Sequence, residues 1–421
     1  MQQTHTRRNM IGGVIGNVLE WYDFAVFGYF APIIGAHFFP AESQLASLIN
    51  AFGVFAAGYL MRPLGGLIFG YIGDRMGRKH ALQWSVLLMA IPTTMLGLLP
   101  TYAQIGVTAS ALLVVLRLLQ GLSVGGELIG SMSFITEIAP PNRRGFFGSW
   151  TLFSAICGVM LGSAVATAAH SFLDSAALSS WGWRLSFMAG LLVGGIGLWM
   201  RKGMVETADF QQMKDCGQVD KNPIISAIRS SPIQIIRVGA MVVLMGGGFY
   251  MLFVWWPTYL TKIVTPSVPH ALLVNTIAMA AMMALIPMAG WLSDLLGRKT
   301  VIVTSLIGLI LTGWPLFVLT DHGTFLSALC AQLVFALLLA GTQGPMPAAM
   351  VEMFPTRTRF SGIGVGYNVS LAVFGGTAPL VSTWLVARTG NIVAPAYYLI
   401  FLASISLVAA LGWRLGIKDR A

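Results

Sequence analysis

The sequence contains few charged residues for its length. Only 10 % of the 421 residues are Asp, Glu, Lys or Arg, whereas about a quarter of a soluble domain is charged. Hydrophobic residues make up 56 % of the chain. Such a chain has too little polar surface to face water on all sides, so the composition excludes an ordinary soluble domain and predicts an integral membrane protein.

Cysteine and histidine do not occur in the patterns that a metal site, a disulfide framework or an enzyme active site requires. The three cysteines, Cys157, Cys216 and Cys330, make neither a metal-binding spacing nor a disulfide framework. No P-loop and no nucleophile–base pattern is present, and no histidine lies deep in an apolar run. We therefore expect no enzymatic activity, no metal and no cofactor other than an ion gradient, and a proton relay would have to use carboxylates.

What the chain does have is long apolar runs, such as residues 305–320. A spanning helix needs roughly 20 mostly apolar residues, whereas barrel strands alternate over segments of about ten. Helical windows lie near residues 11–36, 48–72, 81–100, 106–133, 146–170, 184–200, 235–261, 270–293, 300–319, 324–348, 361–387 and 393–413. This predicts an all-α membrane protein with twelve transmembrane helices in two six-helix bundles, residues 1–200 and 233–421, joined by a cytoplasmic linker at 201–232.

The Lys and Arg residues predict the orientation of these helices. With a cytoplasmic N-terminus, only Arg184, Lys262 and Arg388 lie near predicted outer ends, which follows the positive-inside rule. The cations at the cytoplasmic ends of the helices account for the net charge of +10, so the charge does not indicate a nucleic-acid partner. We expect a multi-pass protein of a bacterial-type inner membrane, monomeric, with both termini cytoplasmic and its first helix retained rather than cleaved.

Two ten-residue stretches repeat each other, GYIGDRMGRK at 70–79 and GWLSDLLGRK at 290–299. Each falls in the loop between the second and third helix of its half, and a second echo begins at Glu137 and at Glu352. Parallel repeats of this kind surround a midplane site in transporters. The basic residues of the loops could pair with Glu137 or Glu352, and each Asp lies where helix N-termini could present N–H groups. The predicted cytoplasmic gate comprises Gly70, Asp74, Arg75, Gly77, Arg78, Lys79, Glu137, Arg143, Arg144, Asp294, Arg298, Glu352 and Arg357. The alternative is that these residues only set topology and form turns.

The first loop matches the signature G-x-x-x-D-R-x-G-R-[RK] throughout, and the second departs from it at Leu295. The chain therefore resembles the major facilitator superfamily, which implies two pseudo-symmetric bundles and transport by alternating access. Within it, the chain resembles the metabolite:proton symporters. The motifs that carry this resemblance are GNVLEWYDF (16–24), LMRPLGG (60–66), RLLQGLSVGGE (117–127), WGWR (181–184) and YNVSLAVFGGTAP (367–379). It implies proton-coupled symport of a proline- or betaine-like zwitterion, with a citrate-like tricarboxylate or a dicarboxylate as the alternative.

Ionisable residues inside the spans indicate where coupling and binding could occur, because each is costly in the membrane unless it pairs or lines water. We predict that Asp23, Glu127 and Glu20 serve proton coupling, and that Arg117 and Arg62 bind a substrate carboxylate. The alternative is a fixed set of buried ion pairs. The acids and bases nearly balance, which favours a zwitterion over a multiply charged anion.

Aromatic and neutral polar residues are the candidates elsewhere, because aromatic faces attract quaternary ammonium groups. The further predicted substrate-binding residues are Tyr22, Tyr250, Trp255, Trp256, Gln343, Tyr367 and Asn368. The alternative for the Trp and Tyr residues is interfacial anchoring. Another class of function also remains open, a transporter-like membrane sensor that binds without moving solute.

Overall fold

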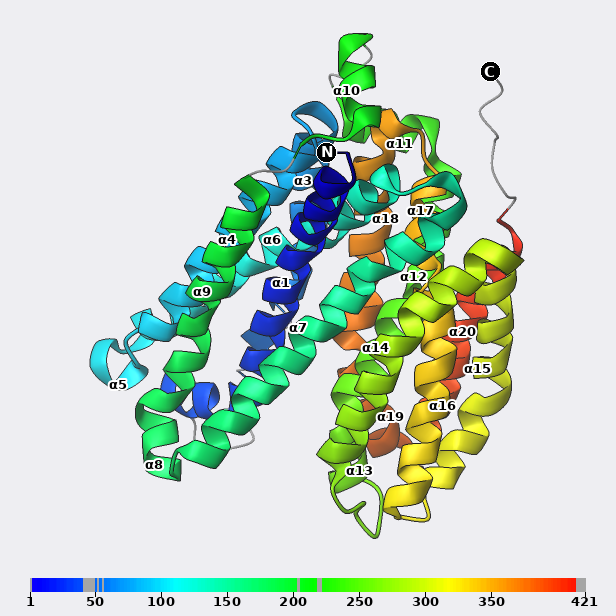
Figure 1. The fold of residues 1–421 in the computed structure, drawn as a ribbon. Coiled ribbons are helices and arrows are strands. Elements are labelled where there is room, and N and C mark those ends of the chain that lie inside the picture. Colours follow the sequence, from blue (N-terminus) through cyan, green and yellow to red (C-terminus); the bar gives the residue numbers. More distant parts are fainter. Residues whose placement is uncertain are drawn as a thin grey trace. The chain divides into compact units, whose positions relative to one another are not determined.

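The computed structural model describes residues 2–40, 50, 53–54, 57–202, 205–217 and 222–413. The described chain is helical and contains no strand (Figure 1). The α-helices are α1 (Gln2–Phe38), α3 (Arg62–Arg75), α4 (Arg78–Leu98), α5 (Tyr102–Ile105), α6 (Val107–Ile138), α7 (Arg144–Phe172), α8 (Ser175–Ala177), α9 (Trp183–Lys202), α10 (Ala208–Asp215), α11 (Pro223–Ser230), α12 (Pro232–Phe249), α13 (Trp256–Lys262), α14 (Ala271–Leu296), α15 (Arg298–Thr320), α16 (Phe325–Gln343), α17 (Met346–Glu352), α18 (Arg359–Ser370), α19 (Gly376–Thr389) and α20 (Ala394–Leu411). Two short 3₁₀ segments, η1 (Pro141–Arg143) and η4 (Thr356–Thr358), precede α7 and α18.

Ten helical stretches of the described chain are long and apolar enough to cross a membrane. They are Arg78–Leu98, Val107–Ile138, Pro141–Phe172, Ser175–Lys202, Pro232–Lys262, Ala271–Leu296, Arg298–Thr320, Phe325–Glu352, Thr356–Thr389 and Ala394–Leu411. These stretches coincide with the ten predicted windows from 81–100 onward. Of the other two windows, α1 covers 11–36, and α3 begins within 48–72, part of which lies outside the described residues.

Three π-helical segments interrupt the spans: η2 (Leu178–Gly182), η3 (Tyr250–Trp255) and η5 (Leu371–Gly375). The second joins α12 to α13 and ends two residues before Pro257, a residue that cannot donate a backbone hydrogen bond inside a helix. Such π segments are frequent at functional sites.

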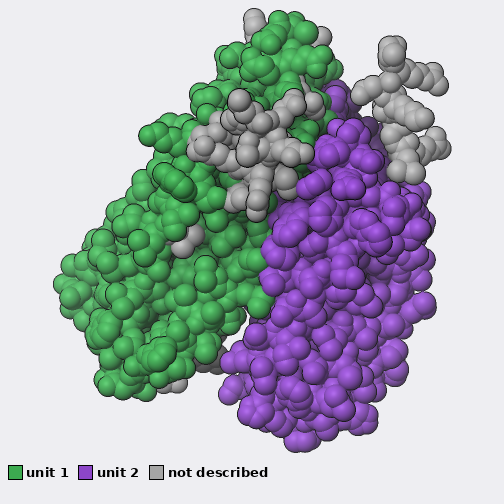
Figure 2. Space-filling model, viewed as in Figure 1, with its two compact units in different colours: residues 1–138, 154–225, 356–364 green, residues 139–153, 226–355, 365–421 purple. Residues whose placement is uncertain are grey.

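The chain forms two compact units, coloured separately in Figure 2. Unit 1 comprises residues 1–138, 154–225 and 356–364, and unit 2 comprises 139–153, 226–355 and 365–421. Each unit thus takes in a short segment from the other half of the sequence. The predicted division of the chain around a linker at 201–232 stays a prediction; α10 and α11 lie within that stretch.

Close backbone contact joins α3 to α6 in unit 1. A Cβ added at Gly65 would overlap the backbone carbonyl of Leu122, and a Cβ at Gly125 would overlap that of Arg62. Gly121 meets the backbone of Gly58 in the same way, just before α3. Small residues let membrane helices approach this closely, so α3 and α6 form a tightly packed pair.

Candidate functional site

Asp23 lies at the centre of a buried polar network in unit 1. Its Oδ2 accepts a hydrogen bond of 2.6 Å from Nη1 of Arg117, and its Oδ1 accepts one of 2.9 Å from Nε2 of Gln120. Gln120 also donates to the hydroxyl of Thr93 at 2.9 Å and accepts from Arg117 at 2.9 Å. The four side chains come from α1, α4 and α6, and all are almost fully buried. The network therefore holds an ionic pair whose geometry is fixed from three helices.

Aromatic rings surround the guanidinium of Arg117. Its central carbon lies 3.6 Å from the centroid of the Phe27 ring and 5.4 Å from that of Phe24. Cation–π contact compensates part of the lost hydration. Nε and Nη2 have no hydrogen-bond partner among the described residues, so Arg117 keeps donor capacity beyond its bond to Asp23.

Glu127 forms a second buried pair, with Arg201 rather than with an arginine of its own helix. Both Nη atoms of Arg201 bond the Glu127 carboxylate, and Ser85 donates to it as well. Arg201 is also bonded to the backbone carbonyls of Gly12 and Leu82. Sequence analysis assigned Arg201 to the polar stretch after the sixth window. In the structure it lies in the last turn of α9 and is fully buried.

Two further charged residues in unit 1, Glu20 and Arg62, are each about 1 % exposed. Neither carboxylate oxygen of Glu20, nor Nε or Nη2 of Arg62, has a hydrogen-bond partner among the described residues. The guanidinium of Arg62 lies over the Tyr59 ring, 5.3 Å from its centroid. Glu20 and Arg62 thus differ from the locked pairs, Asp23–Arg117 and Glu127–Arg201, whose charged groups are in direct contact.

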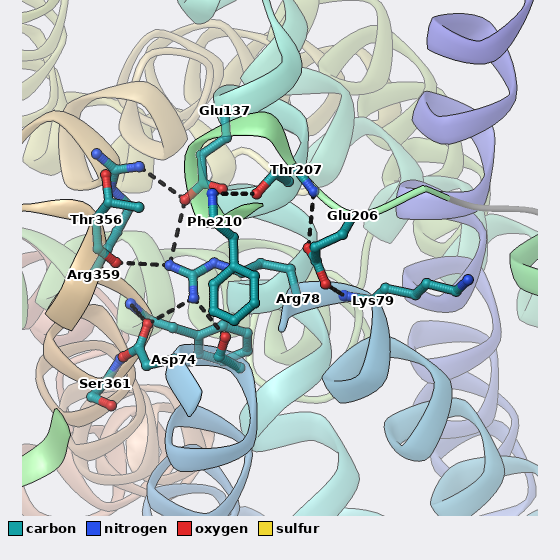
Figure 3. A network of polar contacts seen from close by, with 12 residues as sticks. Asp74, Arg78, Lys79, Glu137, Glu206, Thr207, Phe210, Thr356, Arg359 and Ser361 are labelled. Carbon is teal, nitrogen blue, oxygen red and sulfur yellow. Dashed lines mark hydrogen bonds and ion pairs between the residues drawn. The ribbon is translucent and has the colours of Figure 1, made fainter. Parts of the chain in front are cut away.

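The first signature loop is bonded to the start of α18 within unit 1 (Figure 3). Asp74 accepts backbone hydrogen bonds from Phe360 at 3.4 Å and Ser361 at 2.9 Å. A carboxylate at a helix N-terminus satisfies free N–H groups and complements the helix dipole. The anchoring of a helix N-terminus by the signature Asp, which the sequence suggested, is present.

Arg78 organises the rest of this cluster (Figure 3). It pairs with Asp74 at 3.0 Å and Glu137 at 3.6 Å, and it donates to the carbonyl of Thr356 at 2.8 Å. Arg359 reaches the same Glu137 carboxylate at 2.8 Å. The predicted pairing of a loop arginine with Glu137 is observed, whereas the participation of Arg359 could not be read from the sequence.

The second copy has the same geometry within unit 2. Asp294 accepts from the backbone N–H groups of Gly145 at 2.9 Å and Phe146 at 2.8 Å, at the start of α7. Arg298 pairs with Asp294 at 2.6 Å and with Glu352 at 3.3 Å. The repeat seen in the sequence is therefore a repeat of contacts, since each signature Asp anchors a helix N-terminus.

Gly77 and Gly297 occupy equivalent turns, with φ of 113° and 91°. Backbone in this region is almost exclusive to glycine and costs about 1–3 kcal/mol for other residues. A Cβ at Gly77 would also displace the Glu206 carboxylate, which accepts from the backbone N–H of Lys79, whereas a Cβ at Gly297 would meet only Thr300 Oγ1, at 3.9 Å.

We expect both Ala variants to be destabilised, Gly77→Ala by about 1 kcal/mol more because a hydrogen bond is lost too. Thermal unfolding of both checks this, and equal losses would contradict the role given to Glu206.

The remaining gate candidates lie near these clusters without joining their ion pairs among the described residues. Gly70 packs against Ser361, Arg75 extends over the Tyr71 ring, and Arg143 is exposed. Arg144 is half-buried in the first turn of α7 and Arg357 is exposed in η4. Phe210 of α10 lies in the predicted linker. Its ring packs against Arg78, with 5.3 Å between the ring centroid and the guanidinium carbon.

The aromatic candidates lie in packed surroundings. Trp256 contacts the rings of Tyr259, Phe317 and Phe335 inside unit 2, and Trp255 donates to the hydroxyl of Thr383 at 2.8 Å. In unit 1 the Tyr22 hydroxyl donates to the backbone carbonyl of Ser186 at 2.5 Å. The other candidates, all buried in unit 2, are Tyr250 in η3, Gln343 at the end of α16, and Tyr367 and Asn368 in α18.

Sequence reasoning missed three side chains of the charged networks. Gln120 and Thr93 are neutral and ordinary in a span, although Gln120 stands in the quoted RLLQG motif. Arg201 stands next to Lys202 where the apolar run ends, a position typical of a topology-setting cation. No group of His, Cys, Asp and Glu among the described residues could hold a metal ion.

Two family models match the chain. One described as "Sugar (and other) transporter" matches residues 10–222, and one described as "Major Facilitator Superfamily" matches residues 238–420. The chain belongs to the major facilitator superfamily. It is a membrane transporter and not an enzyme, and the family resemblance predicted from the signature loops is confirmed.

Members of this superfamily that are similar over nearly the whole chain include two bacterial transporters. The "Proline/betaine transporter" of Escherichia coli K12 is 34 % identical over 411 residues, covering 96 % of this chain and 82 % of that protein. The "Glycine betaine/proline/ectoine/pipecolic acid transporter" of Dickeya dadantii is 34 % identical over 415 residues, with the same coverages. Their names agree with the narrower family predicted from the motifs.

Among solved structures, the proton:xylose symporter XylE bound to 6-bromo-6-deoxy-D-glucose superposes with a TM-score of 0.81. It is 18 % identical, and the match covers 98 % of this chain and 95 % of that one. The likeness confirms the major facilitator fold predicted from the twelve windows and the repeat.

Proposed function

We propose that this transporter is a proton-coupled symporter of a small zwitterion of the proline and betaine kind, in a bacterial inner membrane with both termini cytoplasmic. The observation that carries the proposal is the Asp23–Arg117–Gln120 network, an ionic pair buried within the spans of unit 1. The names of the similar transporters support the substrate class. The similarity to these transporters and the buried charges of this chain together make a zwitterion the best candidate.

In this scheme Asp23 carries the proton. While ionised, it holds Arg117 at 2.6 Å and Gln120 at 2.9 Å. A proton on Asp23 removes the charge that holds Arg117, and the freed guanidinium can then turn toward a substrate carboxylate, which it binds through two parallel hydrogen bonds. Proton and substrate therefore favour each other's binding, which is the requirement for symport.

The signature clusters act as cytoplasmic latches in this proposal. Asp74 holds the N-terminus of α18 and Asp294 holds that of α7 through pairs of backbone hydrogen bonds. Opening toward the cytoplasm requires those bonds to break, and the ion pairs of Arg78 and Arg298 must rearrange with them. Charge-assisted bonds of this kind are stronger than neutral ones, so the latches set a barrier to opening.

A carrier of citrate or of a dicarboxylate would need a surplus of cations around its substrate. Outside the signature cluster, the buried charged side chains among the described residues of unit 1 are instead three acids and three bases. The acids are Glu20, Asp23 and Glu127, and the bases are Arg62, Arg117 and Arg201. A balanced set favours a solute with no net charge.

Uptake into proteoliposomes tests the proposal. Labelled betaine and proline are offered with an inward proton gradient, with an inward sodium gradient, or with none, and citrate and succinate serve as comparison substrates. We expect accumulation of a zwitterion under the proton gradient and its collapse on adding a protonophore. Accumulation driven by sodium alone, or of citrate alone, would overturn the proposal, and binding without flux would identify a sensor instead.

A further inference from the structure

The buried charges of unit 1 are not used equally. Asp23 is paired with Arg117, and Glu127 with Arg201. Glu20 and Arg62 take part in none of the ion pairs that the described residues form. The Glu20 carboxylate and the Arg62 guanidinium are therefore outside these ion pairs. Four of their atoms, both carboxylate oxygens and Nε and Nη2, have no hydrogen-bond partner in the described chain.

Leaving such groups unpaired is costly. Each side chain is about 1 % exposed. The two charges attract each other but form no close ion pair, and a buried charge without such contact loses several kcal/mol of hydration. Structural ion pairs avoid this cost by mutual contact, as the locked Glu127–Arg201 pair does in the same unit. Glu20 and Arg62 therefore add little to the stability of the fold. Their free hydrogen-bonding atoms are suited to a ligand that carries both a negative and a positive group.

Aromatic faces stand beside these charges. The guanidinium of Arg62 lies over the ring of Tyr59, and the Tyr59 ring meets that of Phe24 edge-on with centroids 5.0 Å apart. The α1 helix that carries Phe24 also carries Glu20, one turn earlier. Aromatic faces next to a carboxylate are the surroundings that bind quaternary ammonium groups.

We propose that Glu20 and Arg62 are further recognition groups for the zwitterion: Arg62 binds its carboxylate together with the freed Arg117, and Glu20, with the Tyr59 face, binds its cationic nitrogen. The inference deepens the proposed function and rests on it for the substrate class. It gives Glu20 a role in recognition in place of the proton coupling expected from sequence. Both groups are closed to solvent in this structure, so a solute reaches them when the transporter opens, as alternating access requires.

Two ligands of nearly the same shape test the assignment. Glycine betaine carries both charges, whereas 3,3-dimethylbutyrate replaces the quaternary nitrogen with carbon and keeps only the carboxylate. Binding of each to purified protein is measured by calorimetry for wild type, Glu20→Gln and Arg62→Gln. We expect wild type to prefer betaine by at least about tenfold, since a contact between opposite charges contributes this much or more.

The two variants have different expected signatures. Glu20→Gln reduces the preference for betaine to within about twofold and leaves the affinity for 3,3-dimethylbutyrate nearly unchanged. Arg62→Gln weakens both ligands by about tenfold or more, because both carry the carboxylate. A purely structural role would weaken both ligands equally in Glu20→Gln. That result, or unchanged affinity in both variants, would overturn the inference.

The control is Lys202→Gln, which removes an exposed charge in the last turn of α9 and should preserve the betaine preference. If a single variant does not fold, Glu20→Gln/Arg62→Gln keeps the unit neutral and should lose both affinity and preference. Wild type that binds betaine without proton-driven uptake would refute the proposed coupling while the binding data still decide the inference. Normal uptake with unchanged binding in the variants would refute the inference alone, and wild type that binds only citrate or succinate would refute both.

Discussion

Asp23→Asn is expected to abolish proton-driven accumulation of substrate, by at least about 100-fold in initial rate under an imposed gradient. The amide keeps the shape of the side chain and one of the two acceptor oxygens, but it cannot take up a proton. Exchange of external for internal substrate needs no net proton movement and should persist. Uptake driven by the proton gradient and counterflow exchange are measured in the same proteoliposomes.

Arg117→Gln should behave differently, because it leaves the Asp23 carboxylate buried without its cation. Both accumulation and exchange should be lost, together with about 3–5 kcal/mol of stability at a pH where Asp23 is charged. Lys214→Gln is the control, since Lys214 is an exposed cation of the same unit, outside the predicted gate and sites, and should change neither. Wild-type coupled uptake in both Asp23→Asn and Arg117→Gln would end the coupling scheme.

Arg201→Met is the change expected to cost most in stability. It strands the Glu127 carboxylate, which is buried against Ser85 and α1, and removes the bonds to the carbonyls of Gly12 and Leu82. Breaking one side of a buried ion pair costs about 3–5 kcal/mol. Denaturant unfolding in detergent of Arg201→Met, Glu127→Gln and the double variant measures the coupling between the two residues.

The double variant should recover much of the loss, because neutral side chains of similar volume do not need each other's charge. Gly16→Ala probes the same pair from the side of α1, since a Cβ there would overlap both the Glu127 carboxylate and the Arg201 guanidinium. Additive losses in the double variant would show that the two side chains stabilise the protein independently.

The repeat made much of the fold predictable. Helical windows, loop signatures and their spacing locate the helices, because length, hydropathy and turn glycines are local properties of the sequence. Gly77 and Gly297 are examples: their shared position in the repeat already indicates a turn, and both have positive φ. The pairing of Arg78 with Glu137 and of Arg298 with Glu352 follows from the same spacing.

The partners of the buried charges were not predictable in this way. Which side of a spanning helix faces its neighbour depends on packing around the whole bundle, and a mostly apolar helix has no clear polar face to show it. Glu127 and Arg117 share α6, yet one pairs with Arg201 of α9 and the other with Asp23 of α1. Trp256, a candidate wall for a cationic solute, fits equally well in an aromatic core, and the sequence could not distinguish the two.

The glycine contact between α3 and α6 has a mechanical consequence. Arg62 and Arg117 are carried by helices that touch through their backbones, so the two guanidiniums must travel together. Glu20 and Asp23 both travel with α1. If α1 slides along the α3–α6 pair, two anions move away from two cations at the same time. Separating opposite charges costs more energy in surroundings of low polarity than in water. Neutralising these charges with protons and solute lowers that cost, so α1 moves most easily in the fully loaded carrier.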